Sequence, residues 1–511
     1  MHILGIITKK PNNRKRNKFL IIIGTVVIFI VATGIFVARH PTGTEPHLQE
    51  LDEYIETPQV ENEEGMLEDY DYIIPIDAEE TPQERSERIE RERMEFATSI
   101  TIEQMIEDFD YMMAVLEENF PFFDLTYRRH GVDIREEAQR FRDELVNITW
   151  PINARLFKER LRTDFFNSIR GVGHIRTLSR YEYIGHMSSD MSSTVTPVTP
   201  WNTIFYERFT AHPSTSQFYG SFADYDFADA MEQFDMFMHE HDIFYVEIIE
   251  EGRIAYIRIN TLFYVQEASK AILNEFYVQI ADFDHLIIDI RGNTGSWPHA
   301  FHELITVPHL RRPVQLDIVS FYKGGENNLR LLDTLFDPRY NDSLERPSHF
   351  YSETFTLTDD RIDGRDGNPL LLGTQYLDWR DLDAFDYYST GVFYTLYPSS
   401  SDGLQSNFDG QKWLLTDWTS SSGSEHVVAL YKQENLAIIV GEQGSGVFMC
   451  PILLSNYFAL PNTGIIIRYD IGYPVCRHTG HPLEEGIPPH FNNHPRMDAL
   501  QTTLELIAEG V

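Results

Sequence analysis

Short apolar runs that alternate with helical segments in the C-terminal half constrain the fold of this chain most. Residues 253–260 alternate polar and apolar side chains, as a half-buried strand does, and residues 285–290 form a buried-strand run that leads into a glycine loop. Strands that alternate with helices predict an α/β core, which we place at 251–511. The expected strands are 253–260, 285–290, 413–416, 437–440 and 465–467, and the expected helices are 425–433 and 496–508.

A helical N-terminal lobe is expected before this core, at 96–180. Thr101 is a suitable N-cap for a helix that ends near Glu118, because Gln104 follows three residues later, as in a capping box. Apolar residues recur at three- and four-residue intervals through this helix, so one of its faces is expected to be buried. Two further amphipathic helices are expected at 134–148 and 153–169, and the sequence GVGH follows them at 171–174.

The N-terminus carries the clearest topological signal. Phe19–Val37 is an uncharged apolar run of 19 residues, enough to cross the roughly 30 Å hydrocarbon core of a bilayer. Six Lys and Arg residues and no acidic residue precede it. The positive-inside rule therefore predicts a cytoplasmic tail at 1–18, a transmembrane helix at 19–38 and an extracytoplasmic C-terminal domain, in a single-pass protein of the cell membrane. A cleaved signal peptide is the alternative, although Ala32-Thr33-Gly34 is a poor cleavage site inside the apolar run.

The segments between these parts have less regular patterns. Residues 39–95 are expected to be a disordered acidic linker, because 43–83 is rich in Asp and Glu and contains no Lys or Arg. Residues 181–250 are expected to be an irregular connecting segment, and 306–410 shows no assignable period.

Charge and cysteine content exclude several classes of function. A formal net charge of −37 argues against a nucleic-acid partner, because polyanions repel such a surface. Two cysteines are too few for a disulfide scaffold or a cysteine zinc cluster. Cys450 and Cys476 are as compatible with a single disulfide as with two separate buried thiols.

Three short segments could carry chemistry. A strand, a small-residue turn and a helix start follow one another in WLLTDWTSSSGSE (413–425), an arrangement that can expose a serine hydroxyl and direct N–H groups toward an oxyanion. LIIDIRGNTGS (286–296) places Gly292 and Gly295 after a buried strand, where backbone can approach closely. RGVGHIRTL (170–178) supplies His174, and histidine is the usual base for a serine near neutral pH. Alone, each segment is also explained by a helix cap, a tight turn or a structural histidine.

Together and in this order, the three segments resemble the tail-specific (C-terminal processing) protease family, serine peptidase family S41. The family's Ser-Ala-Ser-Ala-Ser-Glu pattern corresponds to Ser420–Glu425, which implies Ser422 as the nucleophile and the N–H of Gly423 as one oxyanion donor. The family's Arg-Gly-Asn-x-Gly loop corresponds to Arg291–Gly295 and implies a second donor at or beside Gly295. The resemblance spans about 100–505 and implies an α/β fold with a crotonase-like (ClpP/crotonase) core.

The departures from the family pattern indicate the branch. In the Ser–Lys branch a lysine follows the serine by 25 residues, where this chain has Val447. The chain is more similar to the branch of tricorn core proteases and retinoid-binding repeats, which implies His174 as the base. In the tricorn type a serine precedes the base and a glutamate completes a tetrad. Here Gly173 replaces that serine, Glu484 or Glu485 is the candidate glutamate, and Pro489-His490 replaces the family's Pro-Asp.

The resemblance implies hydrolysis of peptide bonds through an acyl-enzyme, with His174 accepting the proton of Ser422. A peptide or protein is the expected substrate, and neither a metal nor an organic cofactor is expected. A catalytically inactive ligand-binding or scaffold protein is the alternative, motivated by Val172, Gly173 and His490. An esterase that uses the same serine is a third interpretation, and the oligomeric state stays open.

Overall fold

Three β-sheets organise the part of the chain that the structure, a computed structural model, describes. The described residues are 100–149, 152–191, 200–220, 244–260, 267–295, 298–335, 355–356, 371–373, 376–400, 403–446 and 455–511.

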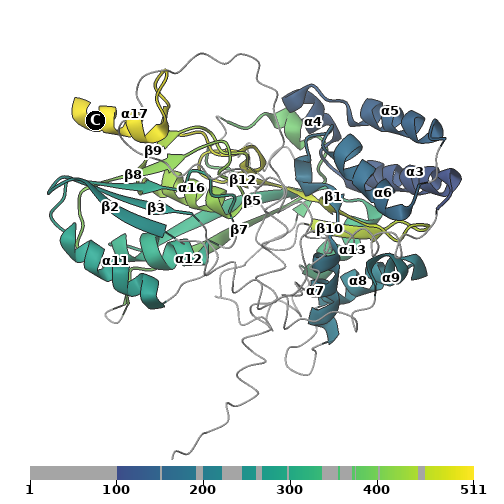
Figure 1. Ribbon diagram of the computed structural model, residues 1–511, viewed down its shortest axis with the longest axis horizontal. Coiled ribbons are helices and arrows are strands. Elements are labelled where there is room, and N and C mark those ends of the chain that lie inside the picture. The colour runs from purple at the N-terminus through teal and green to yellow at the C-terminus, as the bar shows by residue number, and fades with distance from the viewer. Residues whose placement is uncertain are drawn as a thin grey trace, which may run out of the picture.

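A six-stranded sheet forms the core of one lobe (Figure 1). Its strand order is β13-β9-β8-β4-β3-β2, in which β2 is antiparallel to β3 and every other pair is parallel. Parallel strands end at a common edge, so the segments that follow β4 and β8 meet there. The strands are β2 (Phe244–Glu250), β3 (Ile254–Ile259), β4 (His285–Asp289), β8 (Gln411–Thr416), β9 (Ile438–Gly441) and β13 (Phe491–Asn492).

Helices cover both faces of this sheet. On one face α17 (Ala499–Glu509) packs over buried side chains that include Trp413, Leu415 and Val440. On the other face lie α11 (Glu267–Gln279), α12 (His299–Phe301) and α16 (Gly423–Glu434) (Figure 1). Burial on both faces explains the unbroken apolar runs Leu286–Ile288 in β4 and Trp413–Leu415 in β8.

The second lobe is helical and contains a three-stranded antiparallel sheet of order β1-β11-β10. The capping box at Thr101 is present, because its side chain accepts from the N–H of Gln104 and the Gln104 side chain accepts from the N–H of Thr101. The elements are α3 (Ile102–Asn119), α4 (Phe123–His130), α5 (Ile134–Val146), α6 (Ala154–Arg160), the π-helix η1 (Leu161–Phe166), the 3₁₀ turn η2 (Val172–His174), β1 (Arg176–Thr177), α7 (Arg180–Met191), α8 (Pro200–Phe209), α9 (Pro213–Tyr219), α13 (Glu326–Leu335), β10 (Ser455–Ala459) and β11 (Ile466–Asp470).

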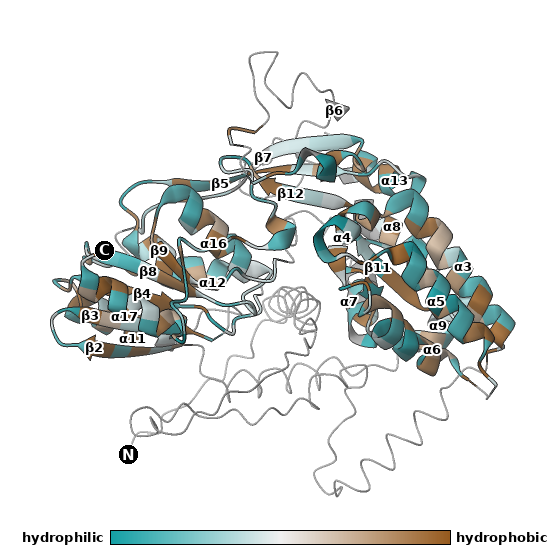
Figure 2. Ribbon diagram, turned by 90° about the horizontal axis from the view of Figure 1, so that it is seen from above, coloured by the Kyte–Doolittle hydropathy of each residue, from teal (hydrophilic) through white to brown (hydrophobic). Residues whose placement is uncertain are grey.

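A four-stranded antiparallel sheet of order β12-β5-β7-β6 joins the two lobes (Figure 2). Only Ile471 separates β11 from β12, so a single stretch of chain passes from the helical lobe into the joining sheet. The remaining elements are η4 (His302–Thr306), η5 (Val307–His309), β5 (Val314–Tyr322), β6 (Phe355–Thr356), η6 (Trp379–Leu382), β7 (Tyr387–Leu396), β12 (Gly472–Cys476) and η7 (Leu483–Glu485).

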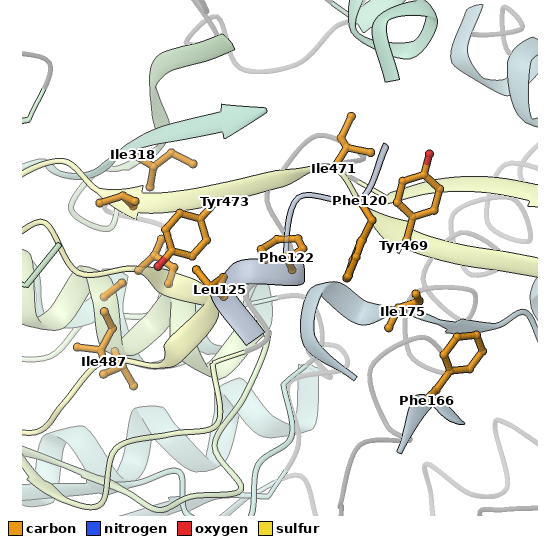
Figure 3. Close-up of a cluster of buried hydrophobic side chains, with 14 of the residues drawn as sticks. Phe120, Phe122, Leu125, Phe166, Ile175, Ile318, Tyr469, Ile471, Tyr473 and Ile487 are labelled. Carbon is orange, nitrogen blue, oxygen red and sulfur yellow. The ribbon is translucent and has the colours of Figure 1, made fainter. Parts of the chain in front are cut away.

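An aromatic core lies where the lobes meet. Figure 3 shows Phe120 and Phe122 beside the β11–β12 stretch, from which Tyr469 and Tyr473 project. The ring centroids are 6.4 Å apart for Phe120 and Tyr469 and 6.2 Å apart for Phe122 and Tyr473. Because all four side chains are nearly inaccessible to solvent, this core fixes the position of the β11–β12 stretch relative to α3 and α4.

Several expectations are confirmed by the structure and others need correction. The helix at 101–118 and the five expected strands are present, and the fold is mixed α/β. The connecting segment at 181–250 is not irregular throughout, because it contains most of α7, all of α8 and α9, and β2, which belongs to the core sheet. The core also does not begin at 251 as one block, since β10 and β11 pair with β1 of the helical lobe.

The N-terminal predictions fall outside the described residues. The predicted transmembrane helix at 19–38, the cytoplasmic tail and the acidic linker all lie there. Within the described ranges, no helix has both the length and the apolar character required to span a bilayer. Cys476 is a free, buried thiol, and Cys450 is outside the described residues.

Asp108 connects α3 to the turn between β10 and β11 through side-chain hydrogen bonds. Its carboxylate accepts the N–H groups of Asn462 and Thr463, both at 2.8 Å, and the Thr463 hydroxyl at 2.6 Å. Asp108→Ala should lower the free energy of unfolding by about 3 kcal/mol, because three donors lose a buried acceptor. Urea unfolding of the purified chain measures this loss.

Asp110→Ala is the matched control, because Asp110 lies on the same helix and forms an exposed ion pair with Arg142. Its expected cost is below about 1 kcal/mol. Equal losses of unfolding free energy for the two variants would show that the Asp108 hydrogen bonds do not stabilise the turn.

Candidate active site

The hydroxyls of the serine run after β8 are bonded to the glycine loop after β4, with one exception. The Ser420 hydroxyl donates to Ile290 O at 3.3 Å, the Ser421 hydroxyl to Thr294 O at 3.0 Å, and the Ser424 hydroxyl to Asn293 O at 2.9 Å. Among the described residues, no hydrogen bond involves the hydroxyl of Ser422. Three serine side chains therefore bond the turn to the glycine loop, whereas the hydroxyl of Ser422, a residue that is 2% exposed, has no hydrogen bond among the described residues.

The backbone at Ser422 forms a sharp turn between strand and helix. Its φ of 52° and ψ of −116° lie in a region that side-chain-bearing residues seldom adopt. Its N–H donates to Gly446 O at 3.0 Å. Gly423 opens α16, and its N–H has no acceptor among the described residues. This N–H lies at the positive end of a helix dipole and could bind an oxyanion at the neighbouring residue.

Gly295 packs directly against this turn. A Cβ at position 295 would overlap Ser421 O and lie 2.6 Å from Gly423 N and 2.8 Å from Ser422 Cβ, so only glycine fits here. Its N–H donates to the side-chain oxygen of Asn293 at 3.0 Å. The role of Gly295 as second oxyanion donor stays a prediction, and it requires this hydrogen bond to open.

His174 is held in the strained GVGH loop of the helical lobe. It has a positive φ of 49° and is almost completely buried. Its Nδ1 bonds to the carboxylate of Asp470, the last residue of β11. A carboxylate only accepts, so the neutral imidazole carries its proton on Nδ1 and its lone pair on Nε2. No hydrogen bond satisfies this buried Nε2 in the described structure.

The electrostatic environment favours a neutral histidine beside an ionised aspartate. Burial lowers the pKa of His174, against the raising effect of Asp470. Burial works to raise the pKa of Asp470, but His174 and the charge of Arg468 outweigh it, so this pKa is below its usual range. A neutral imidazole with a free Nε2 lone pair is the form that a general base requires.

Glu484 lies beside this pair but does not bond to the histidine. Its Oε1 accepts from the N–H of Gly173 at 2.8 Å. Burial and then the charge of Asp470 raise the pKa of Glu484 to about 8. The predicted relay glutamate thus supports the backbone of the GVGH loop, and Asp470 is the residue that contacts the imidazole. The neighbouring candidate, Glu485, accepts instead from the Tyr473 hydroxyl and pairs with Arg129.

Packing explains why glycine occupies position 173. Its φ is 65°, and a Cβ there would lie 2.5 Å from the Phe122 ring and 2.7 Å from the Phe120 ring. A serine at this position would collide with the aromatic core between the lobes. A tricorn-type relay through residue 173 is therefore sterically excluded in this structure.

A glycine-rich segment connects the two halves of the site. Ser421 and Gly446 form a parallel bridge, and a Cβ at Gly446 would overlap Glu484 O. Ser422 thus contacts Gly446, Gly446 contacts the backbone of Glu484, and the Glu484 side chain contacts Gly173. The structure brings the two predicted residues into one neighbourhood, although no hydrogen bond joins Ser422 Oγ and His174 Nε2.

One group of described side chains has the spacing of a metal site. The ligand atoms of His174, Asp470 and Glu484 lie within 4.8 Å of one another. These side chains already bond to one another or to the loop, and the charges of Arg468 and Arg176 act on His174 as well. Both positive charges oppose a cation here, so the hydrogen-bonded arrangement explains the group better than a metal does.

Asp470 was not among the site residues expected from the sequence. Its signal is weak, because an aspartate at the end of a strand usually marks a turn. Only the pairing of β11 with β1 places it beside the GVGH loop, and this pairing joins segments about 290 residues apart. The available clue was the pair of charged residues, Arg468 and Asp470, that follows the short predicted strand at 465–467.

Glu425 provides a test of the electrostatics around α16. It is fully buried, and its Oε2 accepts from the N–H of Ile487 at 2.9 Å. Burial raises its pKa from 4.5 to about 8. Between these pH values Glu425 takes up a proton when the chain folds. Its contribution to the free energy of unfolding is therefore complete below pH 4.5 and is lost as the pH rises to about 8. Glu425→Gln should reduce the decline in unfolding free energy across this window by up to about 1.4 kcal/mol per pH unit.

Urea unfolding at several pH values compares this variant with Glu251→Gln, which removes the same charge at an exposed turn. Identical slopes for the two variants would contradict the assignment of a buried, protonated Glu425.

Comparisons with known proteins identify a family for part of this chain. The sequence model of Peptidase family S41 matches residues 253–492, which include Ser422, Asp470 and Glu484 but not His174. No curated protein matches the chain. A candidate peptidase from Parabacteroides merdae is 14% identical, and the match covers 78% of this chain and 96% of that chain with a TM-score of 0.43. Mature CPAF is 12% identical, with 76% of this chain and 92% of that chain covered and a TM-score of 0.43. The photosystem II D1 C-terminal processing protease is 13% identical, with 52% of each chain covered and a TM-score of 0.28. The family match supports Peptidase family S41 as the family of residues 253–492 and indicates a serine peptidase.

Proposed function

We propose that this protein is an active serine peptidase in which Ser422 is the nucleophile and His174 the general base. Ser422 Oγ attacks the peptide carbonyl while His174 Nε2 takes its proton. The protonated imidazole then gives this proton to the leaving amine, which leaves an acyl-enzyme on Ser422. Water, deprotonated by the same Nε2, hydrolyses the ester and releases the second product.

The main support for the proposal is that the Ser422 hydroxyl has no hydrogen bond among the described residues, unlike its neighbours. Three neighbouring serine hydroxyls are bonded to the glycine loop, whereas that of Ser422 is not. Ser422 also has the strained strand-to-helix backbone that presents a nucleophile above a parallel sheet. Such strain persists only where the surrounding structure enforces it, and here Gly295 and Gly446 do so.

Asp470 and Gly423 complete the chemistry. Asp470 holds His174 in the tautomer that leaves Nε2 free, and its negative charge stabilises the imidazolium that forms during attack. The N–H of Gly423 donates to the oxyanion of the tetrahedral intermediate. All of these contacts come from residues of this chain.

The cellular setting is part of the proposal. The uncharged run Phe19–Val37, with basic residues before it, supports a single membrane anchor with a cytoplasmic N-terminus. The peptidase domain would then act on peptides or proteins outside the cytoplasm. The similarity of the GVGH and serine segments to the tricorn and retinoid-binding branch supports the histidine-dependent mechanism.

Covalent labelling tests the nucleophile directly. The purified chain, treated with a fluorophosphonate and digested, should carry the adduct on Ser422 when analysed by mass spectrometry. Ser422→Ala should abolish labelling, and His174→Ala should slow it about 100- to 10,000-fold, the usual contribution of a general base.

Ser421→Ala is the matched control, because its hydroxyl is adjacent but bonded to Thr294 O. It should still label at Ser422. A folded chain that fails to label would overturn the peptidase mechanism and favour the ligand-binding alternative.

A further inference from the structure

Arg258 differs from every other partly buried arginine that the structure describes. It lies near the carboxyl end of β3, one residue before the strand ends at Ile259. Among the described residues no hydrogen bond or ion pair involves its guanidinium, and its Nε is inaccessible to solvent and has no acceptor. A buried N–H group without an acceptor lowers the stability of the folded chain. We therefore expect the acceptor of Arg258 to come from a bound molecule.

The surroundings of Arg258 place it at the edge where the candidate active site lies. Its Nη2 approaches the exposed Gly292, at 3.7 Å from where a Cβ would be. Gly292 opens the loop that ends at Gly295, which packs on Ser422. Along this loop the guanidinium is at most about 20 Å from Ser422, a distance that about six extended peptide residues can span.

The neighbouring acidic groups are already engaged. Asp289, the register partner of Arg258, is bonded to Arg291 and to the Tyr256 hydroxyl. Asp417 accepts from the N–H of Gly292, and Asp498 pairs with Arg291. None of these carboxylates lies within ion-pair distance of Arg258, which leaves it as an uncompensated positive charge beside the loop.

We propose that Arg258 binds a carboxylate of the peptide substrate, an inference that rests on the proposed peptidase function. A guanidinium recognises a carboxylate through paired charge-assisted hydrogen bonds, and glycine at position 292 lets a peptide backbone approach closely. The carboxylate is either the C-terminal group of the peptide or an acidic side chain. Both sources have the same chemistry, and the experiment separates them.

The experiment uses the full chain with Ser422→Ala, immobilised and exposed to a randomised pool of short peptides. Half of the pool has a free C-terminus and half is amidated. Mass spectrometry of the retained peptides should show enrichment of free C-termini, or enrichment of Asp and Glu in the amidated half. Adding Arg258→Gln should reduce this enrichment about 10- to 100-fold, as expected for the loss of a hydrogen bond to a charged group.

Arg253→Gln is the matched control. Arg253 directly precedes β3, at the end of the strand opposite to Arg258, and pairs with Glu250, so this variant removes the same charge far from the loop. It should leave the enrichment unchanged. Thermal unfolding of Arg258→Gln should give a Tm no lower than that of the parent chain, because no internal hydrogen bond is lost.

The outcomes separate this inference from the proposed function. No carboxylate enrichment in the parent chain, or equal loss in Arg258→Gln and Arg253→Gln, overturns the role of Arg258. Fluorophosphonate labelling of Ser422 in a chain that carries only Arg258→Gln should proceed at the normal rate. Absence of labelling in the wild-type chain would instead overturn the peptidase mechanism itself.

Discussion

The candidate site depends on backbone segments that lie against one another with no side chain between them. Gly295 packs on the Ser422 turn, and Gly446 packs on the Glu484 carbonyl, so a methyl group at either position would separate the parts. A similar constraint holds at Gly173, against the rings of Phe120 and Phe122. These contacts hold a serine of the core lobe and a histidine of the helical lobe in one neighbourhood.

Local sequence patterns predicted the parts of this site but not its connections. The apolar run 285–290 and the small-residue turn at 417–422 mark a strand and a helix start because their signals lie within a few residues. The contact between His174 and Asp470 depends on the pairing of β1 with β11, which no local period encodes. The helices α7, α8 and α9 were missed for a similar reason, since their aromatic rings pack on one another and on Tyr457 of β10, contacts that no local period encodes.

The same aromatic core explains both the glycine at position 173 and the position of Asp470 beside His174. The aromatic core between the lobes excludes a side chain at position 173, which removes a tricorn-type relay. Asp470 is the last residue of β11, in the β11–β12 stretch that the same core holds in place, and its carboxylate contacts the imidazole directly. Burial and the charge of Asp470 raise the pKa of Glu484 to about 8. The Glu484 carboxyl group accepts a hydrogen bond from the backbone of the GVGH loop instead of contacting the imidazole.

The most direct test of this account is the rate at which a fluorophosphonate labels Ser422 at pH 7 in Asp470→Asn and in Glu484→Gln. Asp470→Asn should slow labelling about 1,000- to 10,000-fold, because the imidazole loses the acceptor that fixes its tautomer. Glu484→Gln should change the rate less than about threefold, because Glu484 is already protonated at this pH and glutamine has nearly the same shape. A slow Glu484→Gln together with an unaffected Asp470→Asn would contradict the account and restore the glutamate relay.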